Sequence, residues 1–490
     1  MHNGDVSYWW NAIGLPTQRP ALTGPTEADV CVIGGGYTGL WTAYYLRQAD
    51  PSLRVVVLES EFAGFGASGR NGGWVTAALT GSRSVYERHG DVDALEAALR
   101  ETVDEVGRVC EAEGIQADYV KGGSLSVAMS ATQEARLRAS SPGQTWLTPE
   151  ELSSRLRVAG AHGAMFTPHC ARVQPAALVS GLASAVSRLG VTIYEGSRVV
   201  SVSPGVARTA FGEVRARYIL RCTEGFTADF PGQHRTLLPM NSAMIVTEPL
   251  PPSAWDTIGW SGAETLGDEA HAYMYAQRTA DGRIALGGRG IPYRFGSGID
   301  SRGAVAPSTV SELHAVLTRM FPAAADAGIA HAWCGVLGVP RDWCASVSFN
   351  SSTGLGWAGG YAGHGVAAAN LAGRTLADLA RGVSSPLVSL PWVNHRSREW
   401  EPEPFRWAGV HSLYAVYRLA DRLESDGQPS ARVAAGKALG RAGDLISGIP
   451  HLRFDGLCRP GSGPQPHRCP IDGVIPPSMA HRWALNANGQ

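Results

Sequence analysis

Three glycines, Gly34, Gly36 and Gly39, have the spacing G-x-G-x-x-G. The first glycine of this motif permits a tight turn, the second lets the backbone approach a pyrophosphate, and the third lets a helix pack on a strand. Glu59 follows 20 residues after the last glycine, at a place where a carboxylate can accept hydrogen bonds from ribose hydroxyls. These residue types at this spacing predict a dinucleotide-binding site.

The chain around the motif has the pattern strand, turn, helix, strand. Val30–Ile33 is apolar and precedes the turn, and the apolar run Val55–Leu58 ends directly before Glu59. The helix that starts after Gly36 offers free N–H groups and a partial positive charge to phosphates. A glycine-rich turn without function is the alternative, but the complete frame with its acid favours the binding site.

A second glycine cluster, residues 64–73, holds five glycines in ten residues. Glycine loses too much backbone entropy for such a stretch to form a stable helix. The cluster predicts a loop whose backbone lies against a flat ligand, with Ser68, Arg70 and Asn71 as polar contacts. A flexible linker is the alternative, which the following Trp74-Val75 disfavours.

A third glycine-rich segment, residues 354–365, opens a helix that is predicted to run to about Arg381. Three such loops in one α/β chain predict a discontinuous cofactor-binding domain of residues 28–90, 150–230 and 330–385. The predicted substrate domain comprises residues 91–149 and 231–329, and a C-terminal helical extension covers residues 386–449. Residues 450–490 are rich in Gly, Pro, His and Ser, which predicts an irregular tail.

Hydrophobic periodicity predicts the remaining elements. Helices are expected at residues 91–113, 175–189, 305–321 and 413–423. Strands are expected at residues 121–128, 191–194, 198–202, 214–220, 244–246, 272–275 and 283–286.

Composition limits the class of protein. A chain of 490 residues exceeds one compact core, and a net charge of −1 gives no electrostatic footprint for nucleic acid or an anionic membrane. Eight cysteines without a C-x-x-C pair predict buried thiols in a reducing compartment. No stretch of about 18 apolar residues occurs, so no membrane span is predicted. We expect a cytoplasmic protein without a metal site.

At these motifs the chain resembles the D-amino-acid-oxidase-like (DAO) family of FAD-dependent oxidoreductases, over roughly residues 5–385. Residues 66–73, 287–293 and 400–404 are similar to the γ-glutamylputrescine oxidase subgroup of that family. The resemblance implies an α/β fold, with a Rossmann-like FAD-binding domain and an inserted antiparallel-sheet substrate domain of α+β type.

The resemblance also implies the cofactor contacts. The ADP half of FAD would bind at the first turn and Glu59, the backbone of Val199 would bind adenine, and the isoalloxazine would lie against residues 66–73 and 360–365. A helix start at residues 363–366 would stabilise negative charge on the reduced flavin. The implied cofactor residues are Gly34, Gly36, Tyr37, Thr38, Gly39, Glu59, Ser60, Gly66, Ala67, Ser68, Arg70, Asn71, Gly72, Gly73, Val199, Thr223, Gly360, Tyr361, Gly363, His364, Gly365 and Val366.

In this family the substrate is a neutral amine or N-substituted amino acid. Its α-hydrogen leaves as hydride, and the resulting imine hydrolyses, so no strong base is needed. The candidate catalytic residues are Arg289, His364, Tyr275 and Tyr273. Arg289 holds a substrate acid or pairs with a neighbouring carboxylate, with the two roles about equally favoured, and core packing is the commoner role of strand tyrosines.

The sequence departs from the family at two positions. Ala285 stands where sarcosine-type oxidases have a lysine that assists the reaction with oxygen, so Arg289 or His364 supplies the cation, or electrons pass to an acceptor other than O2. Gly335, next to Cys334, stands where some relatives attach FAD through cysteine, which predicts non-covalent FAD. An NAD(P)H-dependent flavin monooxygenase is a less favoured alternative, because it requires a second dinucleotide-binding unit.

Overall fold

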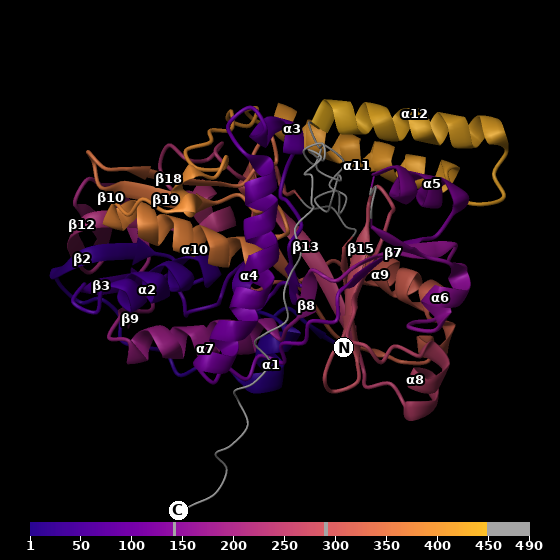
Figure 1. Ribbon diagram of the computed structural model, residues 1–490, viewed down its shortest axis with the longest axis horizontal. Coiled ribbons are helices and arrows are strands. Elements are labelled where there is room, and N and C mark those ends of the chain that lie inside the picture. Colours follow the sequence, from indigo (N-terminus) through magenta and orange to yellow (C-terminus); the bar gives the residue numbers. More distant parts are fainter. Residues whose placement is uncertain (141–143, 289–292, 448–490) are drawn as a thin grey trace, which may run out of the picture.

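The computed structural model describes residues 1–140, 144–288 and 293–447. Arg289 and the expected tail at 450–490 lie outside this part of the chain. The described residues form two large sheets side by side, with helices on both (Figure 1). This arrangement confirms the predicted fold class: a Rossmann-like α/β unit, an antiparallel-sheet unit and a C-terminal helical pair.

The first sheet contains the strands around the glycine turn. Parallel pairs join β19, β12, β2, β3 and β9 in that order, and β18, β11 and β10 add antiparallel pairs. Its strands are β2 (Thr26–Ile33), β3 (Val55–Leu58), β9 (Thr192–Tyr194), β10 (Val199–Ser203), β11 (Val206–Thr209), β12 (Glu213–Arg221), β18 (Ser346–Asn350) and β19 (Leu355–Gly359).

Helices cover this sheet on the side of its main core. Val30, Val32 and Leu220 point toward α2 and α10 and are at most 1% exposed. Long apolar faces on these helices exclude water from the strands, which fixes the turn before α2 in place. The helices are α2 (Tyr37–Ala49), α4 (Val92–Ala112), α7 (Pro175–Arg188) and α10 (Gly365–Arg381), with α1 (Tyr8–Ile13) and the short α3 (Arg83–Tyr86) nearby.

The second sheet is mainly antiparallel, in the order β1-β17-β13-β16-β15-β14-β5-β7-β6. Its strands are β1 (His2–Asn3), β5 (Ser124–Ala128), β6 (Thr145–Leu147), β7 (Gly163–Thr167), β13 (Leu238–Thr247), β14 (Thr265–Asp268), β15 (Met274–Arg278), β16 (Ile284–Gly288) and β17 (Ile329–Val339). Strands β4 (Trp74–Thr76) and β8 (Cys170–Arg172) form a separate ribbon.

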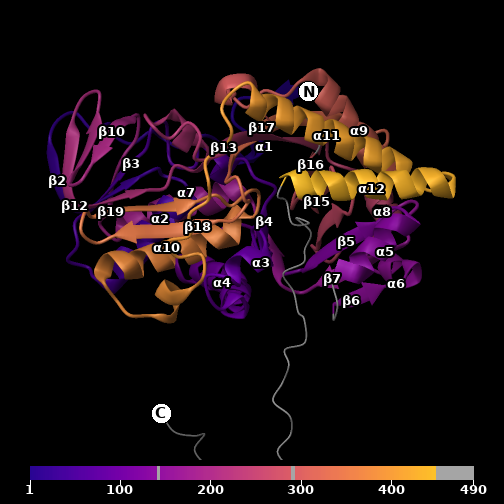
Figure 2. The ribbon, with the colours of Figure 1, turned by 90° about the horizontal axis from the view of Figure 1, so that it is seen from above.

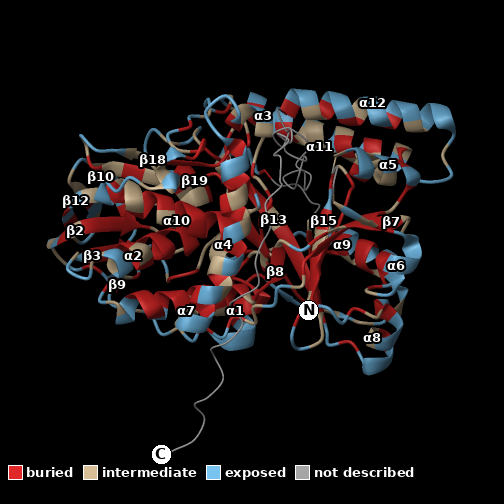
Figure 3. Cartoon of the chain, viewed as in Figure 1, coloured by how far each residue is buried: buried red, intermediate tan, exposed pale blue. Residues whose placement is uncertain are grey.

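Helices α11 and α12 lie along the half of the molecule that holds the second sheet, as two views at right angles show (Figures 1 and 2). The outer helix α12 is largely exposed, whereas the central strands of both sheets are mostly buried (Figure 3). The helices of this half are α5 (Ala131–Ser140), α6 (Pro149–Ser153), α8 (Pro252–Ile258), α9 (Pro307–Met320), α11 (Phe405–Leu423) and α12 (Ser430–Ser447).

Two strands pair with the second sheet although their residues fall in segments predicted for the cofactor-binding domain. These are β7, within 150–230, and the first ten residues of 330–385, which belong to β17. Hydrophobic alternation identifies a strand but not the sheet that it joins. The domain boundaries themselves stay a prediction.

Candidate functional site

The glycine turn joins the end of β2 to the start of α2. Gly34 has a φ of +106°, and a Cβ there would lie 2.5 Å from the carbonyl oxygen of Cys222. A Cβ on Gly39 would lie 2.0 Å from the carbonyl oxygen of Gly34. Gly34 is therefore required by conformation and space, and Gly39 by the close packing of α2 on the turn.

Glu59 reaches back to this turn from the end of β3. Its Oε2 accepts a hydrogen bond from the Gly35 N–H at 2.7 Å, and its Oε1 accepts one from the Glu61 N–H at 3.0 Å. Burial raises the pKa of Glu59, and the backbone donors oppose that shift. The acid that sequence spacing selected thus lies directly beside the glycine turn.

A cavity of about 370 Å³ extends from the turn along the carboxyl ends of the parallel strands. We call it the nucleotide cavity. Val199, on the edge strand β10, and Thr223, after β12, also lie in its wall, Thr223 next to Gly34. The predicted cofactor residues that line it are Gly34, Gly36, Tyr37, Thr38, Glu59, Ser60, Gly66, Ala67, Ser68, Val199 and Thr223.

The second glycine cluster packs against the start of α2. Ser68 Oγ accepts a hydrogen bond from the Tyr37 N–H at 2.8 Å. Trp9 and Trp10 of α1, both nearly fully buried, donate their indole N–H groups to the carbonyls of Asn71 and Gly64. The N-terminal helix therefore supports this loop, a role that its short, isolated aromatic run does not reveal in the sequence.

The polar side chains of Arg70 and Asn71 in this loop form hydrogen bonds with the protein. Arg70 is 3% exposed and donates to the carbonyls of Phe65, Ser301 and Cys334. The Asn71 amide donates to two carbonyls of its own loop and accepts from the Gly73 N–H at 2.8 Å. The polar groups of Arg70 and Asn71 thus stabilise the loop conformation. Contacts of these residues with a ligand would therefore involve their backbone and the aliphatic parts of their side chains.

A second cavity, which we call the substrate cavity, meets the nucleotide cavity at Ala67. It has a volume of about 110 Å³ and lies between the glycine loops and the second sheet. The predicted site residues in its wall are Ala67, Arg70, Asn71, Gly72, Tyr273, Tyr275, Gly363, His364 and Val366. Residues from the second sheet, from β4, from the glycine loops and from α10 thus converge on one space.

Tyr275 and Tyr273 lie on the sheet side of the substrate cavity. The Tyr275 ring fills the space that side chains on Gly72 and Gly287 would need, and its hydroxyl lies 2.9 Å from Ser242 Oγ. Tyr273 precedes β15 instead of lying within it and is 37% exposed. Both tyrosines therefore line the cavity, although they do not share one strand as predicted.

The third glycine segment ends at the start of α10. Tyr361 is buried, and its hydroxyl lies 3.0 Å from Thr38 Oγ1 of α2, so the two helix starts are tied together. Burial lowers the pKa of His364, which precedes α10, to about 4. The lowered pKa favours a neutral imidazole near pH 7, which disfavours His364 as the cation in place of the missing lysine. The role of His364 stays a prediction.

Glu224 is a residue of this site that sequence reasoning missed. Its Oε1 accepts hydrogen bonds from the N–H groups of Gly360 and Tyr361, both at 2.9 Å, and its Oε2 accepts one from Gly338 at 2.7 Å. Burial raises its pKa to about 7. One carboxyl group thus joins the third glycine segment to β17.

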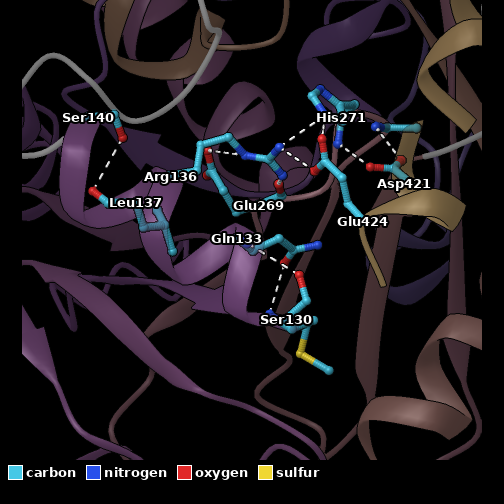
Figure 4. A network of polar contacts seen from close by, with 11 residues as sticks. Ser130, Gln133, Arg136, Leu137, Ser140, Glu269, His271, Asp421 and Glu424 are labelled. Carbon is cyan, nitrogen blue, oxygen red and sulfur yellow. Dashed lines mark hydrogen bonds and ion pairs between the residues drawn. The ribbon is translucent and has the colours of Figure 1, made fainter. Parts of the chain in front are cut away.

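Asp268 and Glu269 also line the substrate cavity and were not predicted; they are 3% and 5% exposed. A polar network behind them reaches the C-terminal helices (Figure 4). Arg136 donates to the carbonyl of Glu269 at 2.6 Å and pairs with Glu424 of α11 at 2.6 Å.

Asp421 of α11 holds the next residues of the same loop. Its carboxylate accepts hydrogen bonds from the backbone N–H groups of His271 at 2.7 Å and Ala272 at 3.1 Å. The loop from Asp268 to Tyr273 therefore carries cavity residues on one side and is fixed by α11 on the other (Figure 4).

Cys334, next to one of the two positions where the sequence departs from the family, and Ala285, at the other, do not line the substrate cavity. Gly335 lines the substrate cavity, whereas the thiol of neighbouring Cys334 lies 3.6 Å from the Ala304 carbonyl in the core of the second sheet. Ala285 is fully buried in β16. Arg289 lies outside the described residues, so its role stays a sequence-based prediction.

Among the residues that the structure describes, no helix is both long and apolar enough to cross a membrane.

Comparison with known proteins gives a consistent assignment. The sequence profile described as "FAD dependent oxidoreductase" (DAO) matches residues 29–379. Gamma-glutamylputrescine oxidoreductase of Escherichia coli is 30% identical over 417 residues, which covers 81% of this chain and 93% of that protein.

Solved structures share the fold. Glycine oxidase from Geobacillus kaustophilus superposes with a TM-score of 0.64 at 21% identity, covering 76% of this chain and 99% of the other. L-proline dehydrogenase from P. horikoshii gives a TM-score of 0.61 at 19% identity, covering 75% and 98%.

Proposed function

This chain belongs to the DAO family of FAD-dependent oxidoreductases, and we propose that it oxidises the C–N bond of an amine or an amino acid. The observation that carries the proposal is the meeting of two cavities at Ala67. One has the groups that recognise a dinucleotide, and the other is enclosed by aromatic and acidic side chains. Such an arrangement brings a small substrate next to one end of a bound cofactor.

The residues present fit FAD. The start of α2 lies in the wall of the nucleotide cavity, where its free N–H groups suit a pyrophosphate. Glu59 is placed to accept from ribose hydroxyls, and Val199 offers the backbone of an edge strand to adenine. When bound, FAD would accept the hydride, which carries both electrons, from the substrate carbon.

The chain's own residues supply orientation and exclusion of water. Tyr275 and Trp74 form an aromatic wall, with their ring centroids 6.3 Å apart. Asp268 and Glu269 place carboxyl groups in the cavity wall that can accept hydrogen bonds from the N–H groups of a neutral amine. His364 offers a hydrogen-bonding nitrogen at the start of α10.

The acceptor that reoxidises the enzyme is either O2, giving H2O2, or another electron acceptor. Sarcosine-type oxidases have a lysine that assists the reaction with O2, and Ala285 stands at that position in this chain. Because the lowered pKa of His364 favours its neutral form, these two residues favour an acceptor other than O2. The gamma-glutamylputrescine relative favours an amine as substrate.

An anaerobic screen tests the proposal. Purified enzyme is mixed with primary amines, N-methyl amino acids and polyamine conjugates, and loss of the oxidised flavin absorbance is recorded. Bleaching by at least one amine, followed by recovery in air or with an artificial acceptor, supports amine oxidation and identifies the acceptor. Bleaching by NADPH and by none of the amines would replace the proposal with a monooxygenase.

We further propose that FAD is held without a covalent bond, because the Cys334 thiol points into the core and no cysteine among the described residues lines the substrate cavity. Acid precipitation should release all yellow colour into the supernatant. Colour that stays with the pellet and is lost in Cys334→Ser would contradict this.

A further inference from the structure

A third cavity, of about 630 Å³, lies apart from the two cavities described above. Arg221 of β12 and Trp357 of β19 form its floor, where the two strands pair. Residues 346–351 and 394–397 contribute its other walls. The segment after Asp229 separates it from the nucleotide cavity, because Phe230 and Pro231 line one and Gln233 and Leu237 line the other.

The charges in this third cavity are all positive. None of the described residues that line it is an Asp or a Glu, whereas Arg221 and Arg396 both line it. Within the described part of the chain neither arginine forms an ion pair. The guanidinium of Arg221 makes one long hydrogen bond, to Gln233 Oε1 at 3.4 Å, and lies 5.6 Å from the centre of the Trp357 ring.

An arginine in this position is costly unless an anion joins it. Removing a charge from water is unfavourable when no opposite charge replaces the lost hydration. Burial accordingly lowers the pKa of Arg221 to about 10. Its guanidinium presents planar donors that match the oxygens of a carboxylate or phosphate.

Uncharged donors surround the same space. The hydroxyls of Ser346, Ser348 and Ser351 line the cavity and make no hydrogen bond to another described residue. The side-chain oxygen of Asn394 accepts from the Phe349 N–H at 3.3 Å, which leaves its amide N–H groups available. The cavity therefore combines two positive charges with several free donors and no carboxylate among the described residues that line it. Asp342 lies behind His395, one of the lining residues, at 2.8 Å from its Nε2.

We propose that the third cavity binds a small-molecule oxyanion, the phosphate or carboxylate group of a metabolite, with Arg221 as its main charged partner. This site is separate from the flavin and substrate cavities and does not depend on the amine chemistry. Its ligand is recognised by charge and by hydroxyl donors.

Isothermal titration calorimetry on the FAD-loaded enzyme tests the site. Inorganic phosphate and citrate are the probes, and a chloride salt at the same ionic strength is the control titrant. We expect one probe to bind with one-to-one stoichiometry. Binding by phosphate alone identifies a phosphorylated ligand, and binding by citrate alone identifies a carboxylate. Arg221→Met should weaken the affinity at least tenfold, because it removes the charge-assisted hydrogen bonds of the guanidinium while keeping an unbranched apolar stem.

Two further variants complete the test. Arg396→Gln, at an exposed position in the same cavity, should weaken binding severalfold even if Arg221→Met fails to fold. Arg217→Met removes the same charge from an exposed position on β12 outside the cavity and should bind like wild type. The proposal would be overturned if neither phosphate nor citrate released more heat than chloride. It would also be overturned if Arg221→Met and Arg396→Gln both bound the probe with wild-type affinity.

Discussion

Gly36 lines the nucleotide cavity at the position where α2 begins. A Cβ there would lie 2.9 Å from Ser68 Oγ, the acceptor that binds the Tyr37 N–H. We therefore expect Gly36→Val to lose FAD, because the side chain blocks the approach of a pyrophosphate and displaces Ser68. The flavin-to-protein absorbance ratio of the purified variant measures this. Gly24→Val is the matched control, since a Cβ at Gly24 meets nothing within 4 Å; a fully yellow Gly36→Val protein contradicts the assignment.

His364 links stability to pH through its lowered pKa of about 4. The unfolded chain, with a histidine pKa of about 6.5, binds a proton more readily than the folded chain between these values. The free energy of unfolding should therefore fall as the pH falls from about 6.5 to 4 and be insensitive to this group above about 7.

Thermal unfolding of wild type and His364→Gln over this pH range isolates the effect. The difference in Tm between the two should change below pH 6.5 and stay constant above 7. His234→Gln, at an exposed histidine, should follow wild type throughout. Parallel Tm curves for wild type and His364→Gln would show that His364 titrates normally.

The residues that sequence could predict are those whose role depends on local spacing. Gly34, Gly39 and Glu59 belong to one short frame, so their relation to each other is visible in the chain. Glu224 is a single acid after a strand, and its three partners come from β17 and the third glycine segment. Only the tertiary fold brings these three N–H groups to the Glu224 carboxylate, so no local sequence pattern predicts its role.

At the level of elements, α11 acts on the substrate cavity without entering it. Asp421→Asn should weaken the two hydrogen bonds to the loop that carries Asp268 and Glu269, since the amide has one acceptor oxygen instead of two. We expect kcat/KM for the amine to fall about tenfold, mainly through KM, which corresponds to about 1.4 kcal/mol. The FAD content should be unchanged.

Asp426→Asn is the control for this prediction. Asp426 lies shortly after the end of α11, but it contacts Ala131 and His162 rather than the cavity loop. Steady-state kinetics with the amine found in the screen compares the two variants. Equal kinetics in both would show that α11 does not position the cavity loop.

The C-terminal elements were only partly predictable. Both α11 and α12 fall within the helical extension predicted at 386–449, and the helix expected at 413–423 is the C-terminal part of α11. No separate helix was predicted at 430–447, where Gly436, Gly440 and Gly443 disfavour one. Side chains at these glycines would meet Glu424, His271 and the Tyr417 ring within 2.9 Å. Close packing on α11 and the cavity loop therefore outweighs the weak helix propensity.

At the level of the whole molecule, residues far apart in sequence build the proposed FAD site. Gly34, Ala67, Val199, Thr223 and His364 come from separate stretches of the chain. Bound FAD should therefore stabilise the folded chain, by about 4 kcal/mol at a free concentration 1,000 times its Kd.

Calorimetry with and without FAD checks this stabilisation. Removal of FAD should lower the Tm of wild type by several degrees, and added FAD should restore it. The Gly36→Val variant, which cannot retain the cofactor, should show no such rise. Identical Tm values for the apo and FAD-loaded wild type would indicate that the cofactor does not join these segments.

The first strand, β1, can pair with its partner strand only after most of the chain has been synthesised. His2 and Asn3 pair with His331 and Ala332 in β17, and Trp9 and Trp10 are buried beside them. At a synthesis rate of roughly 5–20 residues per second, the partner strand leaves the ribosome about 15–65 s after the N-terminus. Throughout that interval the Trp9 indole lacks Trp333, the β17 residue whose ring it contacts edge to face, so the first ten residues present an incompletely covered hydrophobic target for chaperones until β17 emerges.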